Sequence, residues 1–328
     1  MNIFICQTPF QLFYAYELIN YLTKRSENKR FLIIHSSLKV NTKNTKNIDY
    51  IRVDNTAKLV KSFFQLKKVI GALKEIVKEN QSDVSIFIPH IGGLLANYIY
   101  FNNKFRKTFK CEVNFFYEGV LYFYDYKERF KKYHFKRIAI SLFLGFLYRY
   151  KETILPYESD KISYIYTPLR KFTKGKERKK IEVQFNNSGS SFGKENFLIL
   201  GGPVSYLKEF YNASIQEITT MKKENNIIYY KGHASFNTHN PYYKEVFSEY
   251  MKELDLGYEE LDSNMPIELL IEKVKPFKIF SYYSSALLNI KLIYKDEIDV
   301  VCYLNSKEEV SSNILDVFEH YDIDIIRI

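Results

Sequence analysis

Residues 1–19, MNIFICQTPFQLFYAYELI, contain the pattern that decides the fold. Ile3–Cys6 is a continuous apolar run, which is typical of a strand buried on both faces. The polar turn Gln7-Thr8-Pro9 follows, and from Leu12 to Leu22 apolar residues recur at helical spacing. Strand, turn and helix in this order open a parallel α/β domain. We therefore expect parallel strands with helices packed on the sheet.

The same alternation continues along the chain. Apolar strands are predicted at 31–34, 84–88, 113–117, 197–200, 227–230, 278–281 and 298–303. Helices are predicted at 59–77, 206–222 and 242–254, and from Leu94 and Ala286 onward. A cluster of turn-forming residues at 186–193 separates the two series and indicates a linker. We therefore predict two Rossmann-type α/β domains, 1–188 and 189–328, that face a central cleft, with the C-terminal tail packing back on the first domain.

Composition narrows the class of protein. A chain of 328 residues with 46% hydrophobic residues can bury a large core and is not disordered. Three scattered cysteines, Cys6, Cys111 and Cys302, form neither a disulfide framework nor a zinc motif. No signal-peptide pattern and no membrane-spanning apolar run is present. We expect a cytoplasmic protein, at most resting on the inner face of the cytoplasmic membrane.

The positive charge is concentrated in residues 104–185. This segment has 20 Lys+Arg and 9 Asp+Glu, whereas the rest of the chain has 28 and 29, so the net charge of +10 originates here. It contains a ten-residue apolar stretch, 138–147, flanked by Lys136, Arg137, Arg149 and Lys151. The stretch is consistent with a helix resting on anionic lipid, and equally with a core helix whose charged ends are solvated.

Two loops after predicted strands carry candidate acid–base groups. Glu118, followed by Gly119, ends an apolar strand and can act as a general base, although an acidic residue there is often only solvated. Lys231 and His233 follow another strand, where the imidazole can bind a phosphate or act as a general acid. A structural histidine is the alternative. His239 is the poorer candidate because its surroundings resemble an exposed turn.

Two further loops favour a nucleotide. Ser284 and Ser285 lie at a strand-to-helix junction, where hydroxyls and free N–H groups can hold a phosphate or simply cap the helix. Glu268 follows Pro266 near a helix start; it can accept hydrogen bonds from a ribose or serve only the helix.

The sequence contains no P-loop, no GxGxxG and no metal-ligand spacing. The Asp322-Ile323-Asp324 sequence lies near the chain end and is interpreted as incidental. We therefore expect metal-free chemistry on a nucleotide substrate, with no cofactor.

These motifs, in this order, resemble bacterial glycosyltransferase family 52, the lipooligosaccharide and capsule sialyltransferases, which are related to bacterial polysialyltransferases. The resemblance covers most of the chain. It rests on five short motifs: Phe4–Leu12, the acidic-Gly loop at Glu118, Ile199–Pro203, the Lys-Gly-His loop at 231–233, and Pro266-x-Glu268 followed by the serine pair. Tyr117 and Ala234 stand where the family commonly has an acidic residue and a proline.

The resemblance implies a GT-B-like fold and an inverting, metal-independent sialyltransferase. It would transfer N-acetylneuraminic acid from CMP-N-acetylneuraminic acid to a terminal galactose of a lipooligosaccharide or capsule, with an α-2,3 linkage expected. Glu118 would deprotonate the acceptor and His233 would assist the leaving phosphate. The remaining implied roles are CMP binding by Ser284, Ser285, Lys231, Gly201, Gly202 and Glu268, and acceptor-side contacts by Gln7 and Thr8. A homodimer and a peripheral contact with anionic membrane are also implied.

Two alternatives remain open. The first is a transferase of the same fold that uses another nucleotide sugar, such as a hexosyltransferase. The second is a non-enzymatic nucleic-acid-binding protein that uses the aromatic and basic residues of 104–185. It is disfavoured because the charge is confined to one segment and no nucleic-acid module is present, so we expect no nucleic-acid partner.

Overall fold

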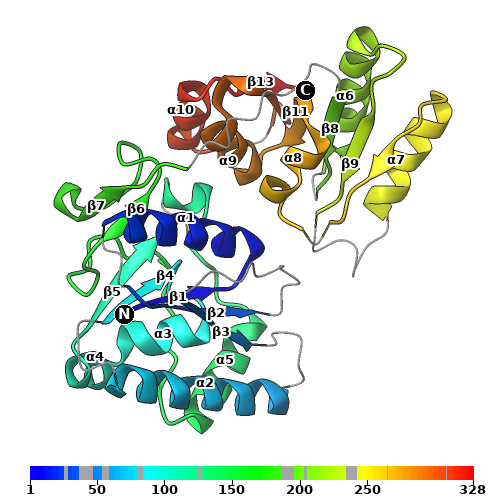
Figure 1. The fold of residues 1–328 in the computed structure, drawn as a ribbon. Coiled ribbons are helices and arrows are strands. Elements are labelled where there is room, and N and C mark those ends of the chain that lie inside the picture. The colour runs from blue at the N-terminus through cyan, green and yellow to red at the C-terminus, as the bar shows by residue number, and fades with distance from the viewer. Residues whose placement is uncertain are drawn as a thin grey trace. The chain divides into compact units, whose positions relative to one another are not determined.

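The structure is a computed structural model that describes residues 1–25, 29–36, 47–53, 59–79, 84–123, 127–185, 196–202, 205–233, 242–263, 265–307 and 309–328. The chain divides into two compact units, Met1–Gln184 and Phe185–Ile328 (Figure 1). The expected linker at 186–193, and with it the expected boundary at 188/189, falls outside the described residues.

The first domain contains a seven-stranded parallel sheet in the order β3-β2-β1-β4-β5-β6-β7. The strands are β1 (Asn2–Cys6), β2 (Phe31–Ser36), β3 (Ile48–Val53), β4 (Val84–Ile88), β5 (Cys111–Phe116), β6 (Ile165–Thr167) and β7 (Lys180–Glu182). The helices are α1 (Pro9–Arg25), α2 (Leu59–Glu79), α3 (Leu94–Phe101), α4 (Asn103–Thr108) and α5 (Lys132–Phe143), with 3₁₀ turns η1 (Val120–Tyr122) and η2 (Glu177–Lys179). Helix α1 lies on one side of the sheet, and α2, α3 and α5 lie on the other (Figure 1).

Strand β1 is central to this sheet, which explains its unbroken apolar run. Phe4 is opposite Ile33 of β2 on one side and Phe87 of β4 on the other. The rings of Phe4 and Phe87 stack with centroids 4.5 Å apart. All five residues of β1 are buried, so the strand is covered on both faces as parallel sheets require.

The second domain repeats the arrangement with six parallel strands in the order β10-β9-β8-β11-β12-β13. The strands are β8 (Asn196–Leu200), β9 (Ile228–Lys231), β10 (Glu259–Glu260), β11 (Pro276–Tyr282), β12 (Asp299–Leu304) and β13 (Asp324–Arg327). The helices are α6 (Leu207–Met221), α7 (Tyr242–Glu253), α8 (Ile271–Val274), α9 (Ser285–Tyr294) and α10 (Ser312–His320), with 3₁₀ turns η3 (Ile267–Leu269) and η4 (Lys295–Glu297). Both sheets therefore have the doubly wound strand order of a Rossmann domain.

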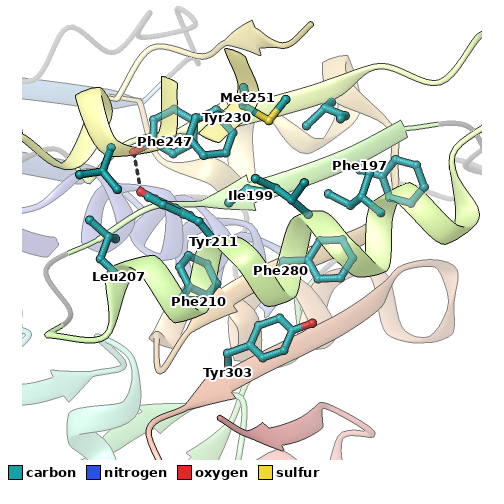
Figure 2. Close-up of a cluster of buried hydrophobic side chains, with 14 of the residues drawn as sticks. Phe197, Ile199, Leu207, Phe210, Tyr211, Tyr230, Phe247, Met251, Phe280 and Tyr303 are labelled. Carbon is teal, nitrogen blue, oxygen red and sulfur yellow. Dashed lines mark hydrogen bonds between the residues drawn. The ribbon is translucent and has the colours of Figure 1, made fainter. Parts of the chain in front are cut away.

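Aromatic side chains fill the core between β8, β9, α6 and α7 (Figure 2). Tyr230 stacks on Phe247 with ring centroids 4.2 Å apart, and Tyr211 lies edge-on to the same phenylalanine. The hydroxyls of Tyr211 and Tyr230 are 3.1 Å apart and hydrogen-bond to each other. Two buried phenols therefore satisfy their polar groups within the core, as buried tyrosines usually must.

One expectation about a helix needs correction. The helix expected at 138–147 begins earlier, at Lys132, where the backbone N–H of Lys131 donates to His134 Nδ1 at 2.8 Å. It ends at Phe143, and Gly145 then adopts φ +76°, a backbone conformation that reverses the chain. The C-terminal residues form α10 and β13, and β13 pairs with β12 in the second domain's own sheet. The expected contact of this tail with the first domain stays a prediction.

Candidate functional site

In a doubly wound sheet, ligands bind beside the carboxyl ends of the strands where the strand order reverses. In the first domain that point lies between β1 and β4. Gln7 and Thr8 directly follow β1, His90 follows β4, and Glu118 follows β5. The fold thus brings three loops from distant parts of the sequence to one edge of the sheet.

Glu118 is the centre of this cluster. Its side chain is only 6% exposed, and its Oε2 atom accepts a hydrogen bond from Gln11 Nε2 at 2.7 Å. His90 Nε2 lies 3.6 Å from the same oxygen. Burial raises the pKa of the Glu118 carboxyl, whereas the neighbouring His90 and the Gln11 hydrogen bond lower it by smaller amounts. The carboxylate is therefore more basic than an exposed one, which suits a proton acceptor.

The backbone fixes how His90 faces Glu118. The Gly92 N–H donates to His90 Nδ1 at 2.9 Å, so in the neutral ring the proton is on Nε2, the atom nearest Glu118. The imidazole can thus donate toward the carboxylate. A carboxylate next to a histidine in this way can carry acid–base chemistry.

Gln7 and Thr8 contribute through their backbone. Their N–H groups donate to Gln11 Oε1 at 2.6 and 3.3 Å, which turns the Gln11 amide nitrogen toward Glu118. Thr8 Oγ1 accepts from the Gln11 N–H at 3.2 Å and closes the first turn of α1. The Gln7 side chain lies over Gly93, where a β-carbon would overlap its amide. The loop after β1 therefore orients the group that binds Glu118.

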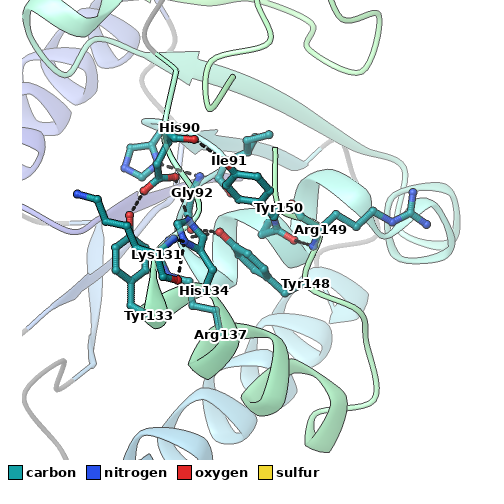
Figure 3. A network of polar contacts seen from close by, with 12 residues as sticks. His90, Ile91, Gly92, Lys131, Tyr133, His134, Arg137, Tyr148, Arg149 and Tyr150 are labelled. Carbon is teal, nitrogen blue, oxygen red and sulfur yellow. Dashed lines mark hydrogen bonds and ion pairs between the residues drawn. The ribbon is translucent and has the colours of Figure 1, made fainter. Parts of the chain in front are cut away.

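Part of the basic segment holds the His90 loop in place (Figure 3). The Tyr148 hydroxyl donates to the Gly92 carbonyl at 3.0 Å and accepts from Arg137 Nη1 at 3.3 Å. The Ile91 N–H donates to the Ile154 carbonyl at 3.0 Å. Arg137, Tyr148 and Ile154 of the basic segment are therefore structural neighbours of the site.

The second domain carries a basic cluster after β9. Lys231 Nζ donates to the Ser263 carbonyl at 3.3 Å. Desolvation lowers the pKa of the Lys231 ammonium, and the carboxylates of Glu268 and Asp262 oppose that shift. His233 is exposed, and its pKa is lowered by partial desolvation and then by the charge of Lys231. The predicted Lys231 and His233 thus lie close enough to interact, as a phosphate site would require.

Glu268 lies in η3 and is buried, with 6% of the residue exposed. Its Oε1 atom accepts a hydrogen bond from Asn289 Nδ2 at 2.8 Å. Burial raises the pKa of Glu268, while hydrogen bonds and the charge of Lys231 lower it. Glu268 therefore acts on Lys231 through the local field.

The serines and glycines border the reversal point of the second sheet, between β8 and β11. Ser284 caps α9: its Oγ accepts from the Ala286 N–H at 3.2 Å. Ser285 begins that helix. After β8, a β-carbon on Gly201 would collide with the Tyr230 hydroxyl, and one on Gly202 with the Tyr282 ring. Both glycines are required by close packing, whichever ligand lies above them.

Three residues of these clusters were not predicted, namely His90, Gln11 and Asn289. His90 had a usable signal, because Pro89-His90-Ile91-Gly92-Gly93 follows a predicted strand as the Glu118 loop does. Gln11 lies within the Phe4–Leu12 motif of the resemblance, which did not single it out, and Asn289 lies within a helix and had no signal. Among the described residues, no group of three His, Cys, Asp or Glu side chains is arranged to hold a metal ion. No helix in the described part of the chain is long and apolar enough to cross a membrane.

Two Rossmann-like parallel-sheet domains give this chain the GT-B fold. Among solved structures, the GT-B domain of a sialyltransferase from Photobacterium damselae aligns over 100% of both chains with a TM-score of 0.55 and 11% identity. A sialyltransferase from Photobacterium damsela aligns with 100% of this chain and 81% of its own, with a TM-score of 0.53 and 12% identity. The UDP-GlcNAc 2-epimerase from Neisseria meningitidis, bound to UDP-GlcNAc, aligns with 96% of this chain and 85% of its own. Its TM-score is 0.50 and its sequence identity is 10%.

No protein-family model matches the chain, and no curated protein matches it in sequence. The similarity to solved structures confirms the predicted fold class. Membership of glycosyltransferase family 52 stays a prediction that rests on the motifs of the sequence.

Proposed function

We propose that the chain is an inverting, metal-independent sialyltransferase that belongs to glycosyltransferase family 52. It transfers N-acetylneuraminic acid from CMP-N-acetylneuraminic acid to a terminal galactose of a bacterial lipooligosaccharide or capsule, with an α-2,3 linkage. The observation that carries the proposal is the buried Glu118 carboxylate between Gln11 and His90, at the reversal point of the first sheet. The similarity in fold to two sialyltransferases supports it.

In this mechanism Glu118 accepts the proton of the acceptor hydroxyl. The acceptor oxygen attacks the anomeric carbon of the sialyl group, and the bond from that carbon to the CMP phosphate oxygen breaks with its electron pair on CMP. A general base of this kind contributes about 10²–10⁴ to a rate. His90, with its Nε2 proton toward Glu118, stabilises the ionised carboxylate before the transfer.

The second domain binds the nucleotide in this proposal. Lys231 and His233 supply positive charge and a proton donor for the leaving phosphate, and Ser284 with Ser285 supplies hydroxyls at the start of α9. Preorganised donors of this kind stabilise the charge that develops on a leaving group. Gly201 and Gly202 let the backbone approach the nucleotide. Glu268 contacts the ribose through the carboxylate oxygen that does not accept from Asn289.

A peripheral membrane contact completes the proposal. At the end of α5, Leu142, Phe143 and Leu147 are 60%, 78% and 57% exposed. The ring of Phe63 lies against Phe143, which adds the neighbouring, exposed Phe64 of α2 to the same apolar surface. Apolar side chains among lysines and arginines suit the surface of an anionic membrane. The homodimer and a cytoplasmic location stay predictions.

The experiment is a calorimetric titration of the full chain with CMP, CDP, UMP and UDP without added metal. We expect selective binding of CMP, followed by transfer from CMP-N-acetylneuraminic acid to lactose. A preference for UDP would overturn the sialyl assignment in favour of a transferase that uses another nucleotide sugar. Binding to none of the four would overturn the nucleotide site itself.

A further inference from the structure

The first domain contains a cavity of about 420 Å³ beside the Glu118 cluster. Gln7 and Gly93, which belong to the loops of that cluster, also line the cavity. The remaining wall comes from the ends of β1, β2 and β3 and from α2, α3 and α5. Its volume is in the range of small-molecule sites. A ligand in the cavity would therefore reach the loops that hold the proposed general base.

The charges on the cavity wall have one sign. Lys136 and Arg137 of α5 line it together with His35 of β2, and none of the described residues that line it is an Asp or a Glu. Among the described residues, no carboxylate forms an ion pair with Lys136 or Arg137. Glu128, the acidic residue beside this part of α5, is already engaged, with its Oε2 3.4 Å from His134 Nε2 and its Oε1 accepting from Tyr133.

Arg137 is the best-positioned of these charges. It is half-buried, and its guanidinium carbon lies 4.6 Å from the centroid of the Tyr133 ring. Nη1 donates to the Tyr148 hydroxyl at 3.3 Å. The stacking and the hydrogen bond fix the side chain without neutralising it. A fixed guanidinium that pairs with no carboxylate in the described part of the chain is suited to bind a phosphate or carboxylate from outside.

We propose that this cavity binds an anionic group, a phosphate or carboxylate, on the acceptor saccharide, so that the enzyme prefers an acidic or phosphorylated glycan to a neutral one. This inference rests on the proposed function and names its acceptor class. A sugar fits the cavity better than a lipid surface does, because the most exposed apolar side chains of α5, Phe135, Leu142 and Phe143, are not part of the cavity lining.

The test is calorimetric binding of galactose, galactose 6-phosphate and galacturonic acid to the full chain without donor. We expect at least one of the two charged sugars to bind about tenfold more tightly than galactose, and the advantage to fall with rising salt. The two charged sugars distinguish a phosphate from a carboxylate preference.

Variants connect the preference to the cavity. Arg137→Gln and Lys136→Gln should each reduce the advantage of the charged sugar, and Arg137→Lys, which keeps the charge, should retain most of it. Lys132→Gln is the matched control, because Lys132 lies on the same helix, is exposed and does not line the cavity. Its binding should equal that of the wild type.

Equal affinity for all three sugars would overturn the proposal, as would an advantage that survives both Arg137→Gln and Lys136→Gln. Vesicles with and without anionic lipid form a further arm. If vesicle binding is lost in Arg137→Gln while the sugars show no preference, the charges serve a lipid surface and the proposal is wrong. Because donor is absent throughout, these outcomes are independent of whether CMP-N-acetylneuraminic acid is the donor.

Discussion

Glu118 is buried, yet the proposed reaction needs it ionised. Desolvation favours the neutral acid, whereas the Gln11 amide at 2.7 Å and the His90 ring at 3.6 Å favour the carboxylate. The pKa of Glu118 is raised as a net result. A carboxylate with a raised pKa is a stronger base, so the same burial that destabilises the charge improves the proton acceptor.

Replacing Glu118 by Gln should abolish most of the proposed activity. Gln cannot accept the acceptor proton, so turnover should fall by about 10²–10⁴, with little change in the circular dichroism spectrum. The measurement is the initial rate of transfer from CMP-N-acetylneuraminic acid to lactose. Glu112→Gln, at an exposed position of β5, is the control and should retain the wild-type rate. A Glu118→Gln enzyme with near wild-type turnover would remove this residue from the mechanism.

The same substitution should change how stability depends on pH. Because the pKa of Glu118 is raised in the folded state, the protonated carboxyl stabilises the folded state, and this contribution is fully present below the ordinary pKa of a glutamate. It is lost as the pH rises through the raised value. The free energy of unfolding of Glu118→Gln, relative to the wild type, should therefore increase from pH 4 to pH 8. Urea unfolding at several pH values measures this; a difference that is constant with pH, or that decreases, would contradict it.

At the residue scale, the sequence was enough to identify the polar residues that follow strands. It was not enough to identify the residues that they contact. Glu118, Gln7 and Thr8 follow recognisable apolar strands, so they could be placed at a sheet edge. His90 becomes the neighbour of Glu118 only because β4 lies between β1 and β5, and strand order is not a local property of the sequence. Gln11 Nε2 faces Glu118 only because the backbone N–H groups of Gln7 and Thr8 bind the side-chain oxygen of Gln11, Oε1.

At the scale of elements, the central strands were predictable and the outer ones were not. Strands β1, β4, β5, β8, β11 and β12 each contain a run of apolar, mostly buried residues, because their neighbouring strands and helices cover most of each strand. Strand β3 contains only exposed and half-buried residues, and β10 consists of two exposed glutamates. Strands β6 and β7 have three residues each. Strands this short or this polar lack the pattern that identifies a buried strand, whether they lie at an edge, as β3, β7 and β10 do, or inside the sheet, as β6 does.

Tyr148 shows how the segment after α5 serves the site. Tyr148→Phe removes the hydroxyl that donates to the Gly92 carbonyl, next to the N–H that fixes the His90 ring. We expect a loss of about 1 kcal/mol in the free energy of unfolding. The pH profile of turnover should also shift, because His90 is less firmly held beside Glu118. Tyr164→Phe, at a 40% exposed ring, is the control. An unchanged pH profile would reduce Tyr148 to a structural role.

At the scale of the whole molecule, the two domains share one strand arrangement, and the proposed function assigns them different roles. Each places its polar groups at the carboxyl ends of the strands near the reversal of strand order. The first domain presents a buried carboxylate and a basic cavity, and the second presents Lys231, His233 and the start of α9. This division predicts that affinities for the two substrates can be changed separately.

Calorimetry with CMP tests that division. Lys231→Gln should weaken CMP binding by about tenfold, because a charge-assisted contact to the phosphate is lost. Glu118→Gln should leave the CMP affinity unchanged, since it lies in the other domain. His233→Ala should weaken CMP less than Lys231→Gln does, because its lowered pKa makes the ring largely neutral at pH 7. A loss of CMP affinity in Glu118→Gln would refute the division.

The position of β1 in the middle of its sheet has a consequence for synthesis. On one side it pairs with β2, which follows early, but on the other it needs β4, which starts at Val84. Strand β8 is in the same situation: it pairs with β9 and must await β11, which starts at Pro276. On the ribosome, each domain therefore passes through a stage in which its most apolar strand is an unpaired edge. At that stage chaperone binding and aggregation compete with folding.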